Sequence, residues 1–88
     1  MELKQKRLLL LGSTSNISRI VKQAQEMGIY VIVTDNKHLR NAPAKQIANE
    51  YINISIADID SLVSYIKKNN INGVLTGFSD SYLYYYHS

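Results

Sequence analysis

Two short stretches of small and polar residues each follow an apolar run, and both have the composition of a ligand-binding turn. Gly12, Ser13 and Thr14 come directly after four consecutive leucines. A second stretch comes after the apolar run 74–76 and again begins with glycine: Gly77, Phe78, Ser79 and Asp80. Glycine permits a sharp turn, and hydroxyl or carboxylate oxygens cap the free N–H groups of a following helix. Because helix N-termini attract anions, both stretches are candidate binding sites.

Asp35 is the third candidate, because it follows the β-branched run 29–34. In dinucleotide-binding domains an acid at this place binds a ribose hydroxyl. The accompanying G-x-G-x-x-G pattern is absent after Gly12, so the backbone lacks the second glycine that lets a pyrophosphate approach closely. The carboxylate is also explained as a cap of its own loop. A nicotinamide-binding half-domain therefore ranks third among the functions considered.

No complete catalytic or metal-binding constellation is visible in the sequence. His38 lies in a polar loop and His87 is next to the last residue, and neither has a cysteine partner or a placed serine. A metal site would need further ligands at defined spacing. Asp58 precedes a helical pattern and is explained as a helix cap. We predict no catalytic residue and no metal ligand in this chain.

The elements that must position these residues alternate between strand and helix. The runs 8–11 and 29–33 are apolar on both faces, which is typical of buried parallel strands. Two weaker strands are predicted at 51–54 and 71–76. Helical spacing of apolar residues predicts helices over 15–27, from Pro43 and over 58–68, and a last helix is predicted to begin at Ser79 or Asp80. In the third of these helices, four residues are expected to face the sheet: Ile59, Leu62, Val63 and Ile66.

This order predicts an α/β fold with a four-stranded parallel sheet in the order 3-2-1-4, half of a Rossmann-like doubly wound domain. Helices are expected on both faces, with the last helix truncated. The direction of the chain across the sheet reverses between the first and fourth strands, and ligands bind at such a switch point. The predicted crevice lies between Gly12–Thr14 and Gly77–Asp80, with Asp35 beside it.

Length and composition limit the alternatives. The 88 residues make one domain, and 45% hydrophobic content fits a folded chain. There is no cysteine, so we expect a cytoplasmic protein without disulfides. The net charge of +3 is scattered without interleaved aromatic residues, which argues against nucleic-acid binding. The apolar run after Arg7 is too short for a membrane span or a signal peptide.

Four segments taken together resemble the N-terminal, pre-ATP-grasp domain of ATP-grasp ligases. They are Leu8–Ser13, Gly28–Asp35, Ala42–Tyr51 and Asn72–Asp80. Carbamoyl-phosphate synthase large subunits and related carboxylate–amine ligases are the members that the chain resembles most. Two positions depart from the family pattern, because Lys45 and Asn49 stand where members often carry histidine and aspartate.

The resemblance implies that the chain shapes part of a substrate pocket and is inactive alone. The residues expected to bind substrate are Gly12, Ser13, Thr14, Asp35, Gly77, Phe78, Ser79 and Asp80. The resemblance also implies that later domains hold ATP and magnesium, so no cofactor is expected on this chain. Its expected partners are a missing ATP-grasp domain and a small-molecule substrate. The alternative from another class is a stand-alone binding or interaction module with the same fold.

The last residues contain a run of tyrosines, Tyr82 to Tyr86 interrupted by Leu83. On a helix beginning near Asp80, part of this run would form one aromatic face. An uncovered aromatic patch seldom stays bare in a monomer. A weak homodimer through Tyr82–Tyr86 is therefore predicted.

Overall fold

A five-stranded sheet organises the chain in the computed structural model, which describes residues 5–76 and the backbone of 83–86. The strands are β1 (Arg7–Leu11), β2 (Tyr30–Thr34), β3 (Glu50–Ile52), β4 (Gly73–Thr76) and β5 (Leu83–Tyr86). Their order is β3-β2-β1-β4-β5. The first four strands pair in parallel, and β5 is antiparallel to β4. The predicted α/β sheet in the order 3-2-1-4 is confirmed.

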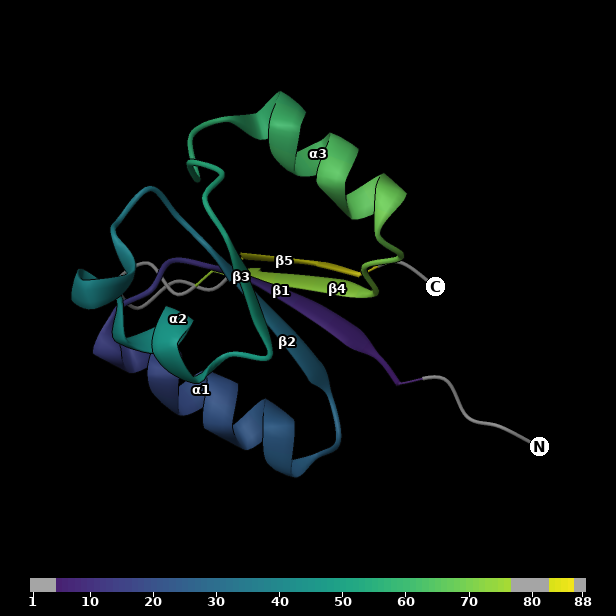
Figure 1. Cartoon of the computed structure of the whole chain (residues 1–88). Helices are drawn as coiled ribbons and strands as arrows, with labels where there is room; N and C mark the ends of the chain where they lie inside the picture. Colours follow the sequence, from purple (N-terminus) through teal and green to yellow (C-terminus); the bar gives the residue numbers. More distant parts are fainter. Residues whose placement is uncertain (1–4, 77–82, 87–88) are drawn as a thin grey trace.

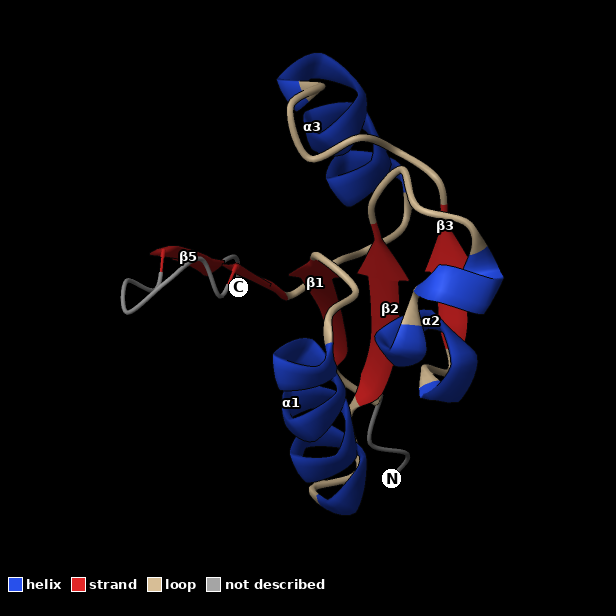
Figure 2. Cartoon of the chain, turned by 90° about the vertical axis from the view of Figure 1, so that its left-hand side faces the viewer, coloured by secondary structure: helices blue, strands red, loops and turns tan. Residues whose placement is uncertain are grey.

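Helices lie on both faces of this sheet. One face carries α1 (Ser15–Glu26) and α2 (Pro43–Ile47), and the other carries α3 (Ile59–Lys68) (Figure 1). A short 3-10 turn, η1 (Leu39–Asn41), precedes α2. Figure 2 shows the strands edge to edge, with α3 apart from α1 and α2. One face therefore has two helices and the other has one.

The core consists of two apolar clusters separated by the sheet. Leu10, Val33 and Val21 belong to the cluster under α1 and α2. Leu9 and Ile32 belong to the cluster under α3. Consecutive leucines of β1 point to opposite faces, and both Leu9 and Leu10 have no exposed surface. This explains why the four residues of β1 that follow Arg7 are all apolar.

Local signals place the ends of the helices where the sequence predicts them. Gly28 closes the turn after α1 with φ of 80°. Asp58 caps α3, since its Oδ1 accepts a hydrogen bond of 3.2 Å from the Ser61 N–H. Pro43 is the first residue of α2. Asn70, with φ of 56°, ends the turn after α3.

Two expectations about the helices are wrong. The segment Leu83–Tyr86 forms the strand β5, whereas a helix was predicted there. Pairing with β4 satisfies its backbone, and tyrosine suits a strand as well as a helix. The second error concerns α3, in which Leu62 and Tyr65 face the sheet, while Ile59 and Val63 are 61% and 41% exposed. Tyr65, which was not expected to face the sheet, belongs to the cluster under α3.

Candidate substrate-binding site

The turn after β1 is built around Gly12. Its φ of 118° lies in the region that favours glycine, and its N–H donates to the Thr34 carbonyl at 2.9 Å. Chain direction changes here, so that Thr14 becomes the N-cap of α1. The side chain of Thr14 makes no capping hydrogen bond and is exposed. The first N–H groups of α1 therefore lack a side-chain cap at the carboxyl edge of the sheet.

Ser13 does not cap α1 either, because it is turned into the protein. It is 1% exposed, and its hydroxyl donates to the Asp35 Oδ2. Its carbonyl accepts from the Ala44 N–H at 3.2 Å. The turn after β1 is thereby tied to the loop after β2 and to the start of α2. The structure brings Gly12, Ser13 and Asp35 together, as the sequence predicts.

Asp35 is buried and fully engaged within the chain. Its Oδ1 accepts from the Lys37 N–H at 2.9 Å and lies 3.0 Å from the Lys45 Nζ, while its Oδ2 accepts from Ser13. Burial raises the pKa of this carboxyl group. The hydrogen bonds from Ser13, Lys37 and Lys45, together with the charge of Lys45, outweigh burial and lower the pKa below its ordinary value of 3.8.

Lys45 is the cation at the centre of this network, and its side chain has no exposed surface. Besides the Asp35 carboxylate, three oxygens lie around Nζ: the Asp35 carbonyl at 3.1 Å, the Lys37 carbonyl at 2.6 Å and the Asn53 Oδ1 at 2.8 Å. A buried ammonium is stable only when its donors are satisfied in this way. Lys45 therefore joins the end of β2, the following loop and the end of β3.

Asn49, the other position that departs from the family pattern, supports the sheet. Its Oδ1 accepts from the Val31 N–H at 2.9 Å and from the Gln25 Nε2 at 3.1 Å. It thus continues the β2–β3 pairing by one position and attaches α1 to it. Both side chains make contacts within the domain, Lys45 from a buried position and the exposed Asn49 through its Oδ1.

Thr76 is a candidate site residue that the sequence interpretation missed. Thr76 is the last residue of β4 and is 7% exposed. It pairs with Leu11, the residue that precedes Gly12. Its Oγ1 is the one buried side-chain polar atom without a hydrogen-bond partner in the described part of the chain. A buried hydroxyl of this kind costs free energy unless something pairs with it. A threonine immediately before the glycine of the second turn was the only signal in the sequence.

The remaining residues considered in the sequence are those of the second turn and the two histidines. Gly77, Phe78, Ser79 and Asp80 lie outside the described residues, as does His87. His38 is exposed and precedes η1 without a side-chain hydrogen bond. Within residues 5–76 no group of three or more potential ligands could hold a metal ion. No helix among the described segments is long and apolar enough to cross a membrane.

The fold and this edge define the class of the protein. It is a Rossmann-like domain with a chain reversal between β1 and β4. Among the described residues, the carboxyl edge there carries a helix without a side-chain cap, a buried ion pair and a hydroxyl without a hydrogen-bond partner. Residues 8–85 match the family described as the PylC-like N-terminal domain, and the chain belongs to this family.

Relatives and solved structures agree with this family. The chain is 39% identical over 64 residues to a formate-dependent phosphoribosylglycinamide formyltransferase of Prochlorococcus marinus, covering 73% of this chain and 16% of the relative. A Methanocaldococcus jannaschii protein with the same name is 37% identical over 62 residues, covering 70% and 15%.

Two solved structures share the fold. N5-carboxyaminoimidazole ribonucleotide synthetase from Thermotoga maritima has a TM-score of 0.72 at 24% identity, covering 84% of this chain and 20% of that one. Glycinamide-RNase-transformylase T from Mycobacterium tuberculosis has a TM-score of 0.74 at 26% identity, covering 83% and 20%. The predicted N-terminal domain of the ATP-grasp ligase family is confirmed. The chain spans about a sixth of the length of the curated relatives it matches.

Proposed function

We propose that this chain supplies one wall of the substrate pocket of an ATP-dependent carboxylate–amine ligase and is inactive alone. The observation that carries the proposal is the carboxyl edge of the sheet. There the turn Gly12–Thr14 and the buried Thr76 hydroxyl end neighbouring strands at the switch point. The two further partners proposed are an ATP-grasp domain that holds ATP and magnesium, and a small-molecule substrate.

The residues at this edge have different roles in the proposal. The exposed Thr14 and the N–H groups at the start of α1 face the pocket, and the hydroxyl of Thr76 lies buried at the same edge. Gly77, Phe78, Ser79 and Asp80 follow Thr76 and complete the proposed contact set. Asp35 and Ser13 act by holding the turn, because the Asp35 carboxylate oxygens are occupied within the chain. The same occupancy argues against a ribose contact by Asp35 and hence against the nicotinamide alternative.

The names of the relatives suggest the chemical class of the substrate. Phosphoribosylglycinamide and N5-carboxyaminoimidazole ribonucleotide both contain a phosphorylated ribose. We therefore propose an amine on a phosphorylated ribose as the substrate. The carbamoyl-phosphate-synthase-like activity that the sequence resemblance implies is the alternative within the same class of ligase.

A binding experiment on the chain itself tests the proposal. Amide NMR spectra of the labelled chain are recorded while phosphoribosylglycinamide is added to millimolar concentration. We expect shifts confined to the amides of Gly12, Ser13, Thr14 and their neighbours at the edge. ATP with magnesium is expected to leave the same amides unshifted, because no phosphate-gripping lysine loop is present. Micromolar binding of ATP at Gly12–Ser15 would overturn the division of roles.

Activity measurements separate the ligase proposal from the alternative of a stand-alone module. The chain with ATP, magnesium, formate and the amine should release no ADP. Adding an ATP-grasp domain from a relative in trans should leave the edge shifts unchanged or strengthen them. If the edge binds no ribonucleotide but the chain captures other proteins through a different surface, the interaction-module alternative is correct.

A further inference from the structure

Two asparagine side chains complete the sheet at its amino edge, where the parallel strands begin. Asn49 comes directly before β3, and its Oδ1 accepts from the Val31 N–H at 2.9 Å. Asn72 comes directly before β4, and its Oδ1 accepts from the Arg7 N–H at 2.8 Å. In each case a side-chain amide oxygen does what a main-chain carbonyl does further along the strand. The two asparagines therefore have the same structural role at two different strand pairs.

The start of β4 is fastened to the start of β1 by further contacts of Arg7. The Asn72 N–H donates to the Arg7 carbonyl at 2.9 Å, and the Arg7 Nε donates to the Asn69 carbonyl at 2.9 Å. Figure 1 shows the chain passing from α3 into β4 at the end of the sheet where β1 begins. These contacts hold β4 in the register that places Thr76 beside Leu11 at the opposite end of the pair.

The two asparagines differ in the residue that follows them. Glu50 follows Asn49, whereas Gly73 follows Asn72, which is the only asparagine of the sequence that precedes a glycine. The main-chain nitrogen of the following residue can attack the side-chain amide of an asparagine and close a succinimide ring. A Cβ on that residue hinders the closure, and glycine has none. Asn72 is therefore the chemically labile member of the pair.

We propose that Asn72 is a site of spontaneous deamidation in the folded chain. The Gly73 nitrogen forms a bond to the Asn72 Cγ and gives up its proton, and the side-chain amide nitrogen leaves with that proton as ammonia. One water molecule then opens the succinimide, so that the only co-reactant is water. The Arg7 N–H already bonded to Oδ1 stabilises the negative charge that this oxygen acquires during the attack. This proposal does not depend on the ligase function.

The two products of ring opening have different structural consequences. Hydrolysis at the side-chain carbonyl gives aspartate, which keeps an acceptor oxygen for the Arg7 N–H. Hydrolysis at the main-chain carbonyl gives isoaspartate, in which the former side-chain carbon belongs to the main chain and lengthens it before Gly73. The pairing of Gly73 with Leu8 then cannot be kept together with the contacts to Arg7. Isoaspartate therefore loosens β4, which carries Thr76 at its other end.

Incubation of the folded full chain in mildly alkaline buffer, below its melting temperature, tests the proposal. Peptide mass spectrometry follows the replacement of NH2 by OH at each asparagine. We expect Asn72 to convert at least about ten-fold faster than Asn49, the internal control that makes the same kind of hydrogen bond. Gly73→Ala should slow the conversion of Asn72 by at least about ten-fold, because it adds the Cβ. Asn72→Gln is the second variant, since its longer side chain closes a larger ring more slowly and should show no mass change.

Hydrogen exchange of the aged chain tests the structural consequence. The fraction of isoaspartate is measured with an isoaspartate methyltransferase. We expect the same fraction of molecules to exchange the amides of β4 rapidly, while the remainder exchange as slowly as the fresh chain. Asn72→Asp represents the other product, and its β4 amides should exchange at the rate of the parent chain.

Three results would overturn the proposal. The first is a folded chain in which Asn72 converts no faster than Asn49. The second is conversion of Asn72 in denaturant but not in the folded chain, which would mean that the contacts with Arg7 shield the amide. The third is an aged chain that contains isoaspartate but exchanges its β4 amides as slowly as the fresh chain, which would mean that the lesion does not loosen the strand.

Discussion

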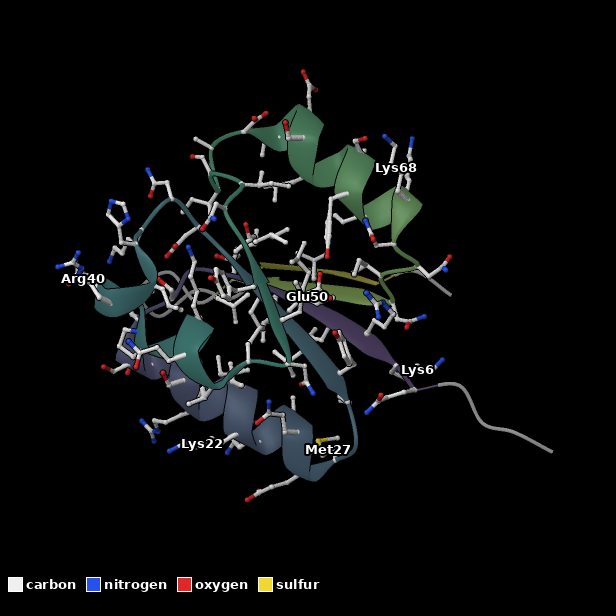
Figure 3. The ribbon with its side chains drawn as sticks, viewed as in Figure 1. Lys6, Lys22, Met27, Arg40, Glu50 and Lys68 are labelled. Carbon is white, nitrogen blue, oxygen red and sulfur yellow. The ribbon has the colours of Figure 1, made fainter. Side chains whose placement is uncertain are left out.

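Asp35 and Glu50 are two carboxylates placed at opposite ends of the same sheet, and their surroundings differ. Asp35, after β2, is buried with a cation, a hydroxyl and a backbone N–H as partners. Glu50, at the start of β3, has two phenols as partners: Tyr30 at 3.0 Å and Tyr65 at 3.3 Å. Tyr65 belongs to α3, so Glu50 lies on the α3 side of the sheet; Figure 3 labels Glu50 in the middle of the molecule. One end is held by an ion pair and the other by neutral donors.

The two ends of the sheet therefore have different roles: the carboxyl edge carries the candidate site, and the amino edge packs against the cluster under α3. At the carboxyl edge the loops have no backbone hydrogen bonds between paired strands to hold their shape. A buried ion pair between Asp35 and Lys45 joins β2, α2 and β3 there instead. At the amino edge the elements already pair, and the tyrosine hydroxyls extend the apolar cluster under α3. Arg7 lies 4.7 Å from the centroid of the Tyr30 ring and donates to the Asn69 carbonyl, which completes that cluster. We therefore expect substitutions at the Asp35 end to lower the free energy of unfolding more than substitutions at the Glu50 end.

The largest effect is expected from Lys45→Met. It removes the cation but leaves the Asp35 carboxylate buried, which costs about 3–5 kcal/mol of unfolding free energy. That is a large share of the roughly 5–15 kcal/mol of a small domain. Chemical denaturation measures the loss. The matched control is Lys22→Met on α1, an exposed lysine, for which we expect a change within about 0.5 kcal/mol.

The double variant Lys45→Met with Asp35→Asn shows whether the charge pair itself is responsible. Removing both charges together should recover part of the loss, because no unpaired ion stays buried. If the double variant is as unstable as the sum of the single variants, the role of Lys45 lies in its hydrogen bonds to Lys37 and Asn53 instead.

Acid is expected to act mainly through Asp35, with a smaller effect than the loss of Lys45. The pKa of Asp35 is lower in the folded chain than its ordinary value of 3.8, so its contribution is complete above that value and is lost as pH falls through the folded pKa. Melting temperatures from pH 6 down should show a steep acid limb that Asp35→Asn flattens. Asp60→Asn, at an exposed acid, should leave the limb unchanged.

Glu50→Gln should cost less, about 1 kcal/mol, because Gln keeps one acceptor oxygen for two phenols. Chemical denaturation of this variant and of Lys45→Met gives the ratio of the losses in unfolding free energy at the two ends of the sheet. Equal losses would mean that the sheet does not separate a charged edge from a neutral one.

Much of this architecture follows from the sequence, because two of its strands are apolar on both faces. The run Leu8–Leu11 predicts a central strand, and the order 3-2-1-4 places the two most apolar strands, β1 and β2, inside the sheet, as in half of a doubly wound fold. The contact between Ser13 and Asp35 follows from that order, since both come directly after neighbouring strands. The rotation of α3 did not follow, because Tyr65 competes with Val63 for the sheet and only packing decides between them.

The partners of Lys45 could not be predicted for a different reason. Lysine is almost never fully buried, so composition assigns it to the surface. Its burial depends on four oxygens from two segments, the loop 35–37 and Asn53, and backbone carbonyls of a loop leave no trace in the sequence. Asn53 reads as one more polar residue at the end of a strand. The network around Lys45 is thus harder to predict from the sequence than the turn Gly12–Thr14 that it supports.

The smallest effect is expected at alkaline pH and at the Glu50 end. The hydrogen bond to Glu50, burial and the charge of Glu50 raise the pKa of Tyr30, and burial and the same carboxylate raise the pKa of Tyr65. Both phenols thus stay protonated in the folded chain above pH 10, where the unfolded chain has lost these protons. Their contribution is complete below the unfolded pKa of 10 and is lost as pH rises through the folded values.

Titration of tyrosinate absorbance measures this, with Tyr30→Phe and Tyr65→Phe assigning two of the seven tyrosines. In Glu50→Gln both pKa values should move back toward 10, because the hydrogen bond to Glu50 and the charge of Glu50 are two of the causes that raise each of them. The alkaline limb of the melting curve should become shallower in that variant, while its acid limb stays as steep as in the parent chain. An acid limb that changes together with the alkaline limb would show that the two carboxylates belong to one coupled network, and the contrast between the two ends of the sheet would then be wrong.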